Sequence, residues 1–210
     1  MSSVPDSLAA TKPAATDGRI TRGRTTRDRI LVAARSHFGT QGYEATPIGA
    51  ILETAGVARG ALYHHFSSKD ALFAAVLDQV LAELAASVRR SARAGADPAE
   101  NLKIGARTWL QLALDPAVQR IVLRDAPAVV GWTRWRTLDD AHTLGATKAA
   151  LRQLAKSGRL PAEATDTLAH LVLAAVGETA LLIARADDPA AALPAGQVAL
   201  EILLDRLLGP

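Results

Sequence analysis

Apolar residues recur every three or four positions along most of this 210-residue chain, which is the spacing of a helix with one buried face. Alanine and leucine supply many of them, and both favour helices over strands. The first stripe follows Thr25 or Thr26, either of which can cap a helix. It consists of Ile30, Leu31, Ala34 and Phe38. The pattern therefore predicts an all-α fold.

Two short helices joined by a glycine turn are predicted next. Thr46 is the expected N-cap of the first, and Pro47 follows in its opening turn, where a missing N–H costs nothing. The apolar stripe of this helix consists of Ile48, Ile51, Leu52 and Ala55. Gly56 supplies a left-handed turn, after which the next helix is expected over residues 58–65.

Longer helices are expected in the rest of the chain. Ser67 and Asp70 form a capping box that opens a helix reaching about residue 93. Asp97-Pro98 and Asp115-Pro116 each provide an N-cap followed by a first helical residue. Further helices are expected near residues 118–123, over 126–158 with a break near Gly131, and over 163–186 and 195–208.

This order of elements divides the chain into three parts. Residues 1–24 mix small, polar and basic residues without periodicity, which is typical of a disordered arm. Residues 25–75 hold the short helices, and residues 76–210 hold the longer, more apolar ones. We expect a small N-terminal helical domain followed by a larger C-terminal helical domain.

The excess of positive over negative charge is confined to the first third of the chain. Residues 1–70 carry nine Lys or Arg against six Asp or Glu, whereas residues 71–210 carry fifteen of each. Between Arg19 and Arg35 the only acidic residue is Asp28. Such a localised basic segment is expected where a protein meets a polyanion such as nucleic acid, although a solvated tail has the same composition.

The composition argues against several other classes of protein. The chain has no cysteine, so it has no disulfide, thiol nucleophile or thiolate metal site. It also has no glycine-rich phosphate loop and no pair of carboxylates placed for catalysis, so we expect neither an enzyme nor a bound cofactor. No apolar run of about 18 residues and no signal peptide are apparent, which predicts a cytoplasmic protein without membrane contact.

The two short helices form a predicted helix-turn-helix, in which the second helix enters the major groove of DNA. Leu62 and Phe66 point inward in this phase, whereas Tyr63 and His64 point outward, where they can reach phosphates or base edges. Lys69 stands at the start of the following helix, where it and free N–H groups form a phosphate site. Tyr63 could instead fill the core, but its neighbours already occupy the inward face.

Residues 27–76 resemble the N-terminal signature of the TetR family of transcriptional regulators. The resemblance rests on the stretches "GYEAT" and "AGVARGALYHHFSSKDAL". It implies an all-helical, homodimeric DNA-binding protein with a three-helix helix-turn-helix domain, commonly a repressor that a small ligand releases from a palindromic operator. The residues expected at the DNA are Arg24, Thr26, Thr46, Pro47, Ala58, Arg59, Gly60, Ala61, Tyr63, His64 and Lys69.

A metal site at His64 and His65 is the alternative use of this cluster. Adjacent helical residues point about 100° apart, and no third ligand lies near them in the sequence. We therefore expect no metal.

The three tryptophans lie in the middle of the chain, where aromatic and aliphatic side chains together favour a pocket for an apolar ligand. The residues expected there are Trp109, Leu112, Leu123, Trp132, Trp135 and His142. The same tryptophans could equally fill the core.

The last two predicted helices are apolar over so much of their surface that they must be buried. The resemblance to TetR regulators implies that they form a four-helix dimer interface, and a monomer core is the alternative. The residues expected in the interface are Leu171, Ala174, Gly177, Leu181, Val198 and Ile202.

The leading hypothesis is thus a ligand-responsive, homodimeric repressor. A TetR-like activator and a DNA binder without an effector are the alternatives, and the second does not explain why about 130 further residues form a helical domain.

Overall fold

The structure is a computed structural model that describes residues 17–95 and 97–209, with side chains from Thr26 onward. These residues are helical and contain no strand, as the sequence predicts. The helices are α1 (Asp17–Gln41), α2 (Ile48–Ala55), α3 (Arg59–His65), α4 (Lys69–Ala92), α5 (Pro98–Leu112), α6 (Pro116–Val118), the π-helix η1 (Gln119–Asp125), α7 (Ala126–Val129), α8 (Trp132–Lys156), the 3-10 helix η2 (Ala162–Ala164), α9 (Thr165–Arg185) and α10 (Pro189–Leu208).

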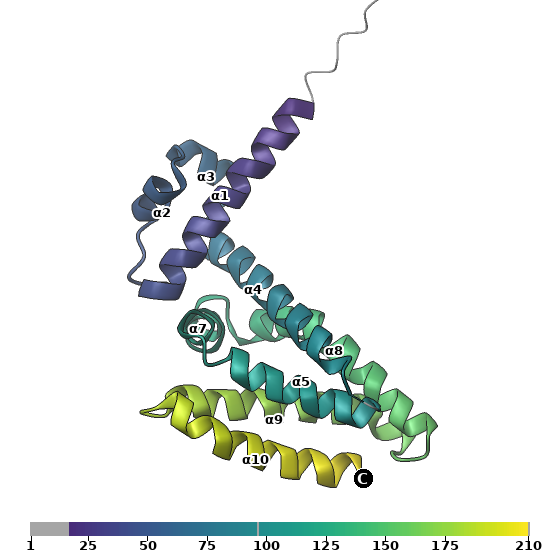
Figure 1. Cartoon of the computed structure of the whole chain (residues 1–210). Helices are drawn as coiled ribbons and strands as arrows, with labels where there is room; N and C mark the ends of the chain where they lie inside the picture. The colour runs from purple at the N-terminus through teal and green to yellow at the C-terminus, as the bar shows by residue number, and fades with distance from the viewer. Residues whose placement is uncertain (1–16, 96, 210) are drawn as a thin grey trace, which may run out of the picture.

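The helices form two groups that share α4 (Figure 1). At one end, α2 and α3 pack on α1. From there α4 runs obliquely into the second group, where it packs on α5 and α8. Helices α9 and α10 pack on each other at the end farthest from α2 and α3. This arrangement matches the predicted small N-terminal and larger C-terminal helical groups.

Helix α1 begins at Asp17, eight residues before the first of the two predicted caps. The prediction of a disordered arm over residues 1–24 is therefore wrong for residues 17–24, and residues 1–16 lie outside the described part of the chain. The physical reason is that a helix anchored in a core extends outward at little cost per residue, and no proline interrupts residues 17–41.

Aromatic rings join α1 to α4. The rings of Phe38 and Phe73, both fully buried, meet edge to face with centroids 5.2 Å apart. Tyr43 contacts both, at 5.9 Å from Phe38 and 5.3 Å from Phe73. Ile51 from α2 and Leu62 from α3 are fully buried in the same core. This cluster fixes the start of α4 against α1, α2 and α3.

Aspartate caps set the start of several helices. The carboxylates of Asp97 and Asp115 each accept two backbone N–H groups, as predicted. Asp188 does the same for α10, which therefore begins at Pro189 rather than near residue 195. The sequence contains this third Asp-Pro signal, and the helix continues through Pro194. At α4 the cap is Ser68, whose hydroxyl accepts the N–H of Ala71, and the expected cap at Ser67 is wrong.

The predicted break at Gly131 is confirmed. Its φ angle of 79° lies in the left-handed region that glycine tolerates, and α7 ends just before it while α8 starts just after it. The segment before α7 is a π-helix rather than the expected α-helix. The π-helix matters because Val122 and Leu123, which lie on it, face the pocket described below.

Two helices have the length and apolar composition of a membrane span, namely residues 69–92 and 162–185. The sequence analysis expected none. Half of the apolar window of α4 is buried within the fold, and 28% of the window at α9 is buried. Both helices fit the core of a soluble protein, because each packs against several neighbouring helices.

The contact between α1 and α6 predicts a difference between two glycines. A Cβ at Gly39 would lie 2.8 Å from the Cβ of Ala117, whereas one at Gly49 would meet nothing within 4 Å. Both residues are helical, so Gly→Ala gains a similar helix propensity at each. We expect Gly49→Ala to stabilise the protein by about 0.5–1 kcal/mol, and Gly39→Ala to be less stable than that variant by about 1–3 kcal/mol. Urea unfolding measures both, and equal stabilisation by the two substitutions would contradict the close contact.

Candidate functional site

The turn between α2 and α3 has the geometry of a helix-turn-helix. Gly56 adopts a left-handed conformation with φ 61°, and its N–H bonds back to Glu53 O. The N–H of Val57 bonds to Leu52 O, which closes the turn. The carbonyl of Gly56 in turn accepts a 3.1 Å hydrogen bond from Arg29 on α1. Helix α3 is therefore held in a fixed direction relative to both α1 and α2.

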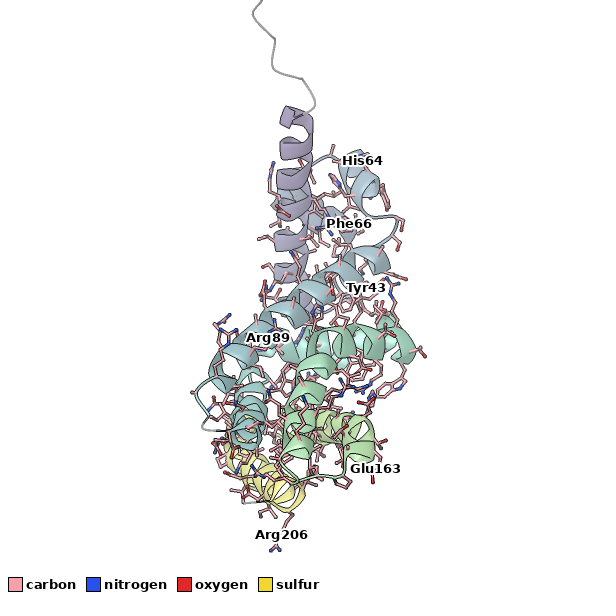
Figure 2. All side chains as sticks on the ribbon, turned by 90° about the vertical axis from the view of Figure 1, so that its right-hand side faces the viewer. Tyr43, His64, Phe66, Arg89, Glu163 and Arg206 are labelled. Carbon is pink, nitrogen blue, oxygen red and sulfur yellow. The ribbon has the colours of Figure 1, made fainter. Side chains whose placement is uncertain are left out.

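Helix α3 buries one face and exposes the other. Leu62 is fully buried and Phe66, which follows the helix, is nearly so, with the Arg27 guanidinium 5.3 Å from the Phe66 ring centroid. Tyr63 is 48% exposed and His64 is also exposed. Figure 2 shows His64 at the outer side of the helix-turn-helix and Phe66 closer to α1. The predicted inward and outward phase of α3 is thus confirmed.

The other residues expected at DNA divide into three groups. The exposed ones share the outer surface of α2 and α3 with Tyr63, and they are Pro47, Ala58, Arg59 and Gly60. Ala61 and Thr26 are half-buried, and the side chain of Arg24 lies outside the described residues.

The expectation that Thr46 caps α2 and faces DNA is wrong. Its side chain is fully buried, its hydroxyl donates to Gly42 O at 2.7 Å, and its N–H bonds to Tyr43 O. Pro47 stands at the cap position instead, without a side-chain bond to α2. The Thr46 hydroxyl bonds to a carbonyl that precedes it in the chain, so it does not accept an N–H of α2. The spacing of residues in the sequence did not predict this choice of partner.

Lys69 is held in place by Tyr43, a residue that was not among the expected DNA contacts. The Lys69 ammonium lies 4.2 Å from the centroid of the Tyr43 ring, a cation–π geometry. The Tyr43 hydroxyl donates to Asp70, the next residue on α4. Burial, followed by this bond to Asp70, raises the pKa of the Tyr43 phenol. The phenol therefore stays neutral, and the ring keeps Lys69 at the N-terminus of α4.

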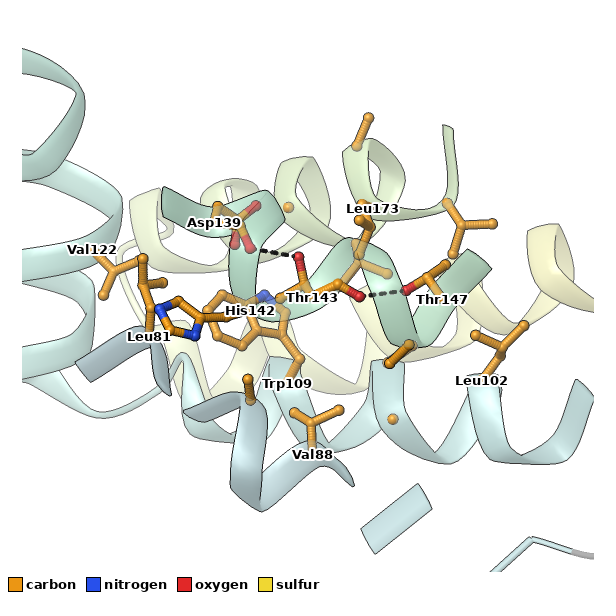
Figure 3. A pocket seen from close by; sticks show the side chains of 18 of the residues that line it. Leu81, Val88, Leu102, Trp109, Val122, Asp139, His142, Thr143, Thr147 and Leu173 are labelled. Carbon is orange, nitrogen blue, oxygen red and sulfur yellow. Dashed lines mark hydrogen bonds between the residues drawn. The ribbon is translucent and has the colours of Figure 1, made fainter. Parts of the chain in front are cut away.

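A cavity of about 470 Å³ lies in the second group of helices (Figure 3). Its walls come from α4, α5, η1, α8 and α9, and most of them are apolar. Of the six residues expected at a ligand, five line it, namely Trp109, Leu123, Trp132, Trp135 and His142. Leu112 does not line it, because it lies in the last turn of α5 and packs against the hydrophobic core. Pockets of this size and character accommodate small organic molecules.

Helix α4 supplies lining residues that the sequence analysis did not identify. Leu81, Ala85, Val88 and Arg89 all face the cavity. Their spacing of three or four residues was visible in the sequence, but the same pattern fits packing in a core. Only the divergence of α4 from the neighbouring helices leaves space there.

Polar groups line one side of the cavity. His142 pairs with Asp78 at 2.8 Å through Nε2, and its backbone carbonyl accepts a bond from Arg89. Asp139 lies 3.7 Å from Arg136, and burial raises the pKa of its carboxyl group. The indole N–H of Trp135 is buried without a hydrogen-bond partner. The cavity therefore combines an apolar interior with unsatisfied polar groups at its wall.

The residues expected in a dimer interface lie on two sides of α9 and on α10. Leu171, Val198 and Ile202 are 57–59% exposed, and Leu182 and Leu203 near them are exposed as well. Ala174, Gly177 and Leu181 instead line the cavity.

A second contact joins the cavity to the helix-turn-helix. The Asp125 carboxylate at the end of η1 accepts the N–H of Tyr43 at 2.7 Å. Arg120, on the same π-helix, donates to Thr40 O at the end of α1 at 2.9 Å. Val122 and Leu123 lie between these two residues and face the cavity. The wall of the cavity is thus hydrogen-bonded to the loop that leads into α2.

The part of the chain described by the structure contains no group of three side chains that could hold a metal ion. His64 and His65 lie with ring centroids 5.1 Å apart.

Two family models match the chain. "Bacterial regulatory proteins, tetR family" matches residues 30–76, and "Tetracyclin repressor-like, C-terminal domain" matches residues 99–207, which is 109 of 210 residues. Together they match most of the small helical group and most of the large one.

The chain is similar to several bacterial transcriptional regulators. A TetR-family transcriptional regulator from Pectobacterium atrosepticum shares 34% identity over 90% of this chain and 97% of its own, with a TM-score of 0.78. The repressor AcnR of Corynebacterium efficiens is 29% identical over 71% of this chain and 77% of its own length. The activator FasR of Mycolicibacterium smegmatis is 38% identical over 37% of this chain, and the match spans about a third of FasR. With one family model covering more than half of it, and with a relative of the same fold along nearly its whole length, the chain belongs to the TetR family of transcriptional regulators.

Proposed function

We propose that this DNA-binding regulator is a homodimeric repressor that a small, mostly apolar ligand releases from a palindromic operator. The observation that carries the proposal is that α4 belongs both to the helix-turn-helix unit and to the wall of the cavity. Its first turn holds Lys69 beside the helix-turn-helix, and its later turns form a wall of the 470 Å³ cavity. A ligand in that cavity contacts the helix that positions the DNA-binding surface.

The outer surface of α2 and α3 is the proposed DNA contact. Exposed Tyr63 and His64 can donate to phosphates or base edges, and the uncovered backbone at Gly60 permits close approach. Lys69 adds a positive charge at the N-terminus of α4, where free N–H groups also attract a phosphate. The arginines of α1 add positive charge in the only part of the chain, residues 1–70, that has an excess of basic over acidic residues.

We expect Tyr63→Phe and Lys69→Ala each to weaken operator binding by about 1–3 kcal/mol, because each removes one contact to DNA. Electrophoretic mobility-shift titrations at several salt concentrations measure the loss. Lys156→Ala, at the far end of α8, removes an exposed lysine away from this surface and serves as the control. Wild-type affinity in both Tyr63→Phe and Lys69→Ala would overturn the proposed docking.

The exposed apolar face of α9 and α10 is the proposed dimer interface. It consists of Leu171, Leu182, Val198, Ile202 and Leu203. A continuous apolar face of this kind usually marks a contact with another protein surface. Two copies joined there would present two α3 helices to successive major grooves, which requires a separation of about 34–36 Å.

We expect Val198→Glu combined with Ile202→Glu to convert the dimer to a monomer, because two buried charges without partners would oppose association. Sedimentation velocity measures the mass, and operator affinity should fall in parallel. Val32→Glu places the same charge at an apolar residue on α1 that is 70% exposed, so it should leave the mass unchanged. A wild-type chain that sediments as a monomer would exclude this interface.

A selection experiment tests the regulatory function directly. The purified chain is allowed to choose among double-stranded oligonucleotides with a random centre, and we expect enrichment of a palindromic sequence with two half-sites. Placing that sequence between a promoter and a reporter gene should then lower expression when the protein is present. Failure to enrich any sequence would contradict specific DNA binding, and a single unpaired half-site would contradict the dimer.

Activation is the second candidate function, because the relative FasR is named as an activator while AcnR is named as a repressor. The same reporter distinguishes the two when the selected site is moved upstream of the promoter. Higher expression with the protein present would favour activation. Either role places the protein with the chromosome in the bacterial cytoplasm.

A further inference from the structure

All three tryptophans of the chain line one cavity together with a poorly satisfied carboxylate. From this juxtaposition we propose that the ligand is a small apolar amine, whose protonated nitrogen lies against Asp139 and among the tryptophan rings. The inference rests on the proposed function only in taking this cavity as the effector site.

The Asp139 carboxylate lacks the partners that a buried charge normally has. Its side chain is only 18% exposed, and within the described residues no donor makes a hydrogen bond to it. Its nearest cation is Arg136 at 3.7 Å, and that guanidinium is closer to Asp140, at 3.3 Å. A mostly buried carboxylate whose only ion pair is a long one remains poorly stabilised until a further positive group reaches it. An ammonium ion in the cavity would supply both the charge and N–H donors.

Near the cavity, carboxylates outnumber basic groups. Four carboxylates lie on its wall or pair with its lining residues, namely Asp78, Asp139, Asp140 and Glu178. The basic groups are Arg89, Arg136 and His142, and His142 is paired with Asp78. The local charge therefore favours a cation over an anion.

The tryptophan rings are the second feature of the cavity, after Asp139, that would bind a cationic amine. Trp135 and Asp139 are four residues apart on α8, so they share one face of the helix. The Trp132 ring lies beside that of Trp135, with centroids 4.8 Å apart, and Trp109 lines the same cavity from α5 (Figure 3 shows Trp109 with Asp139 and His142). The electron-rich faces of aromatic rings attract a desolvated cation.

The cavity volume limits the rest of the ligand. About 470 Å³ with largely apolar walls suits a body of one or two rings or a short alkyl chain.

Three probes with one scaffold and different head groups test the proposal without DNA. They are 4-phenylbutylamine, 4-phenylbutan-1-ol and 4-phenylbutanoate, which at neutral pH are a cation, a neutral molecule and an anion. Binding is followed by tryptophan fluorescence and by isothermal titration calorimetry. We expect the amine to bind tightest. Asp139→Asn should lower the affinity for the amine by about tenfold and change the affinity for the alcohol by less than about twofold.

Asp140→Asn is the matched control, because it removes the same charge one residue along α8 and does not line the cavity. It should lower the affinity of the amine far less than Asp139→Asn does. Tightest binding by the carboxylate probe, equal losses in the two variants, or no binding of any probe at millimolar concentration would each overturn the proposal. Because DNA is absent, these outcomes remain separate from those of the operator selection.

Discussion

The fold depends on the burial of one long helix in two different cores. Helix α4 has 24 residues and spans about 36 Å. Its first turns bury Leu72, Phe73 and Val76 among the short helices, and its middle buries Val80 and Leu81 in the second group. Because no flexible joint separates the two stretches, a displacement of the helix at one end is transmitted to the other. The other contacts between the N-terminal and C-terminal groups of helices, such as those made by Arg120 and Asp125, add to the contact made by α4.

The π-helix provides an additional mechanical link. Its residues Arg120 and Asp125 reach back to the end of α1 and to the loop before α2, while Val122 and Leu123 face the cavity. A π-helix has a wider turn and is less stable than an α-helix, and such segments commonly occur at functional sites. The cavity is therefore in contact with the helix-turn-helix unit at two points, through α4 and through η1. A ligand shifts the position of these elements only by the difference in its affinity for the two arrangements.

Helix α9 also contributes to two parts of the molecule. One side of this helix lines the cavity at Ala174, Gly177 and Leu181, and another side exposes Leu171 and Leu182. Small residues on the cavity side leave room for a ligand, since a Cβ at Gly177 would meet nothing within 4 Å. The proposed dimer face and the cavity thus share one helix wall, so that occupancy of the cavity and the geometry of a dimer are physically connected.

Sequence by itself determined the features that depend on neighbours within a few residues. Helical periodicity, the Asp-Pro caps, the glycine at the turn and the outward direction of Tyr63 all follow from local backbone and side-chain chemistry. Five of the six residues predicted for a ligand pocket line the cavity, because aromatic and aliphatic side chains cluster in the middle of the chain. Tertiary structure alone decided the rest. Tyr43 meets Lys69 from 26 positions away, Asp125 meets Tyr43 from 82 positions away, and Thr46 is fully buried in the packed fold. Whether an apolar stripe is packed or lines an empty space depends on how far helices diverge, and that divergence is a property of the whole assembly rather than of any one segment.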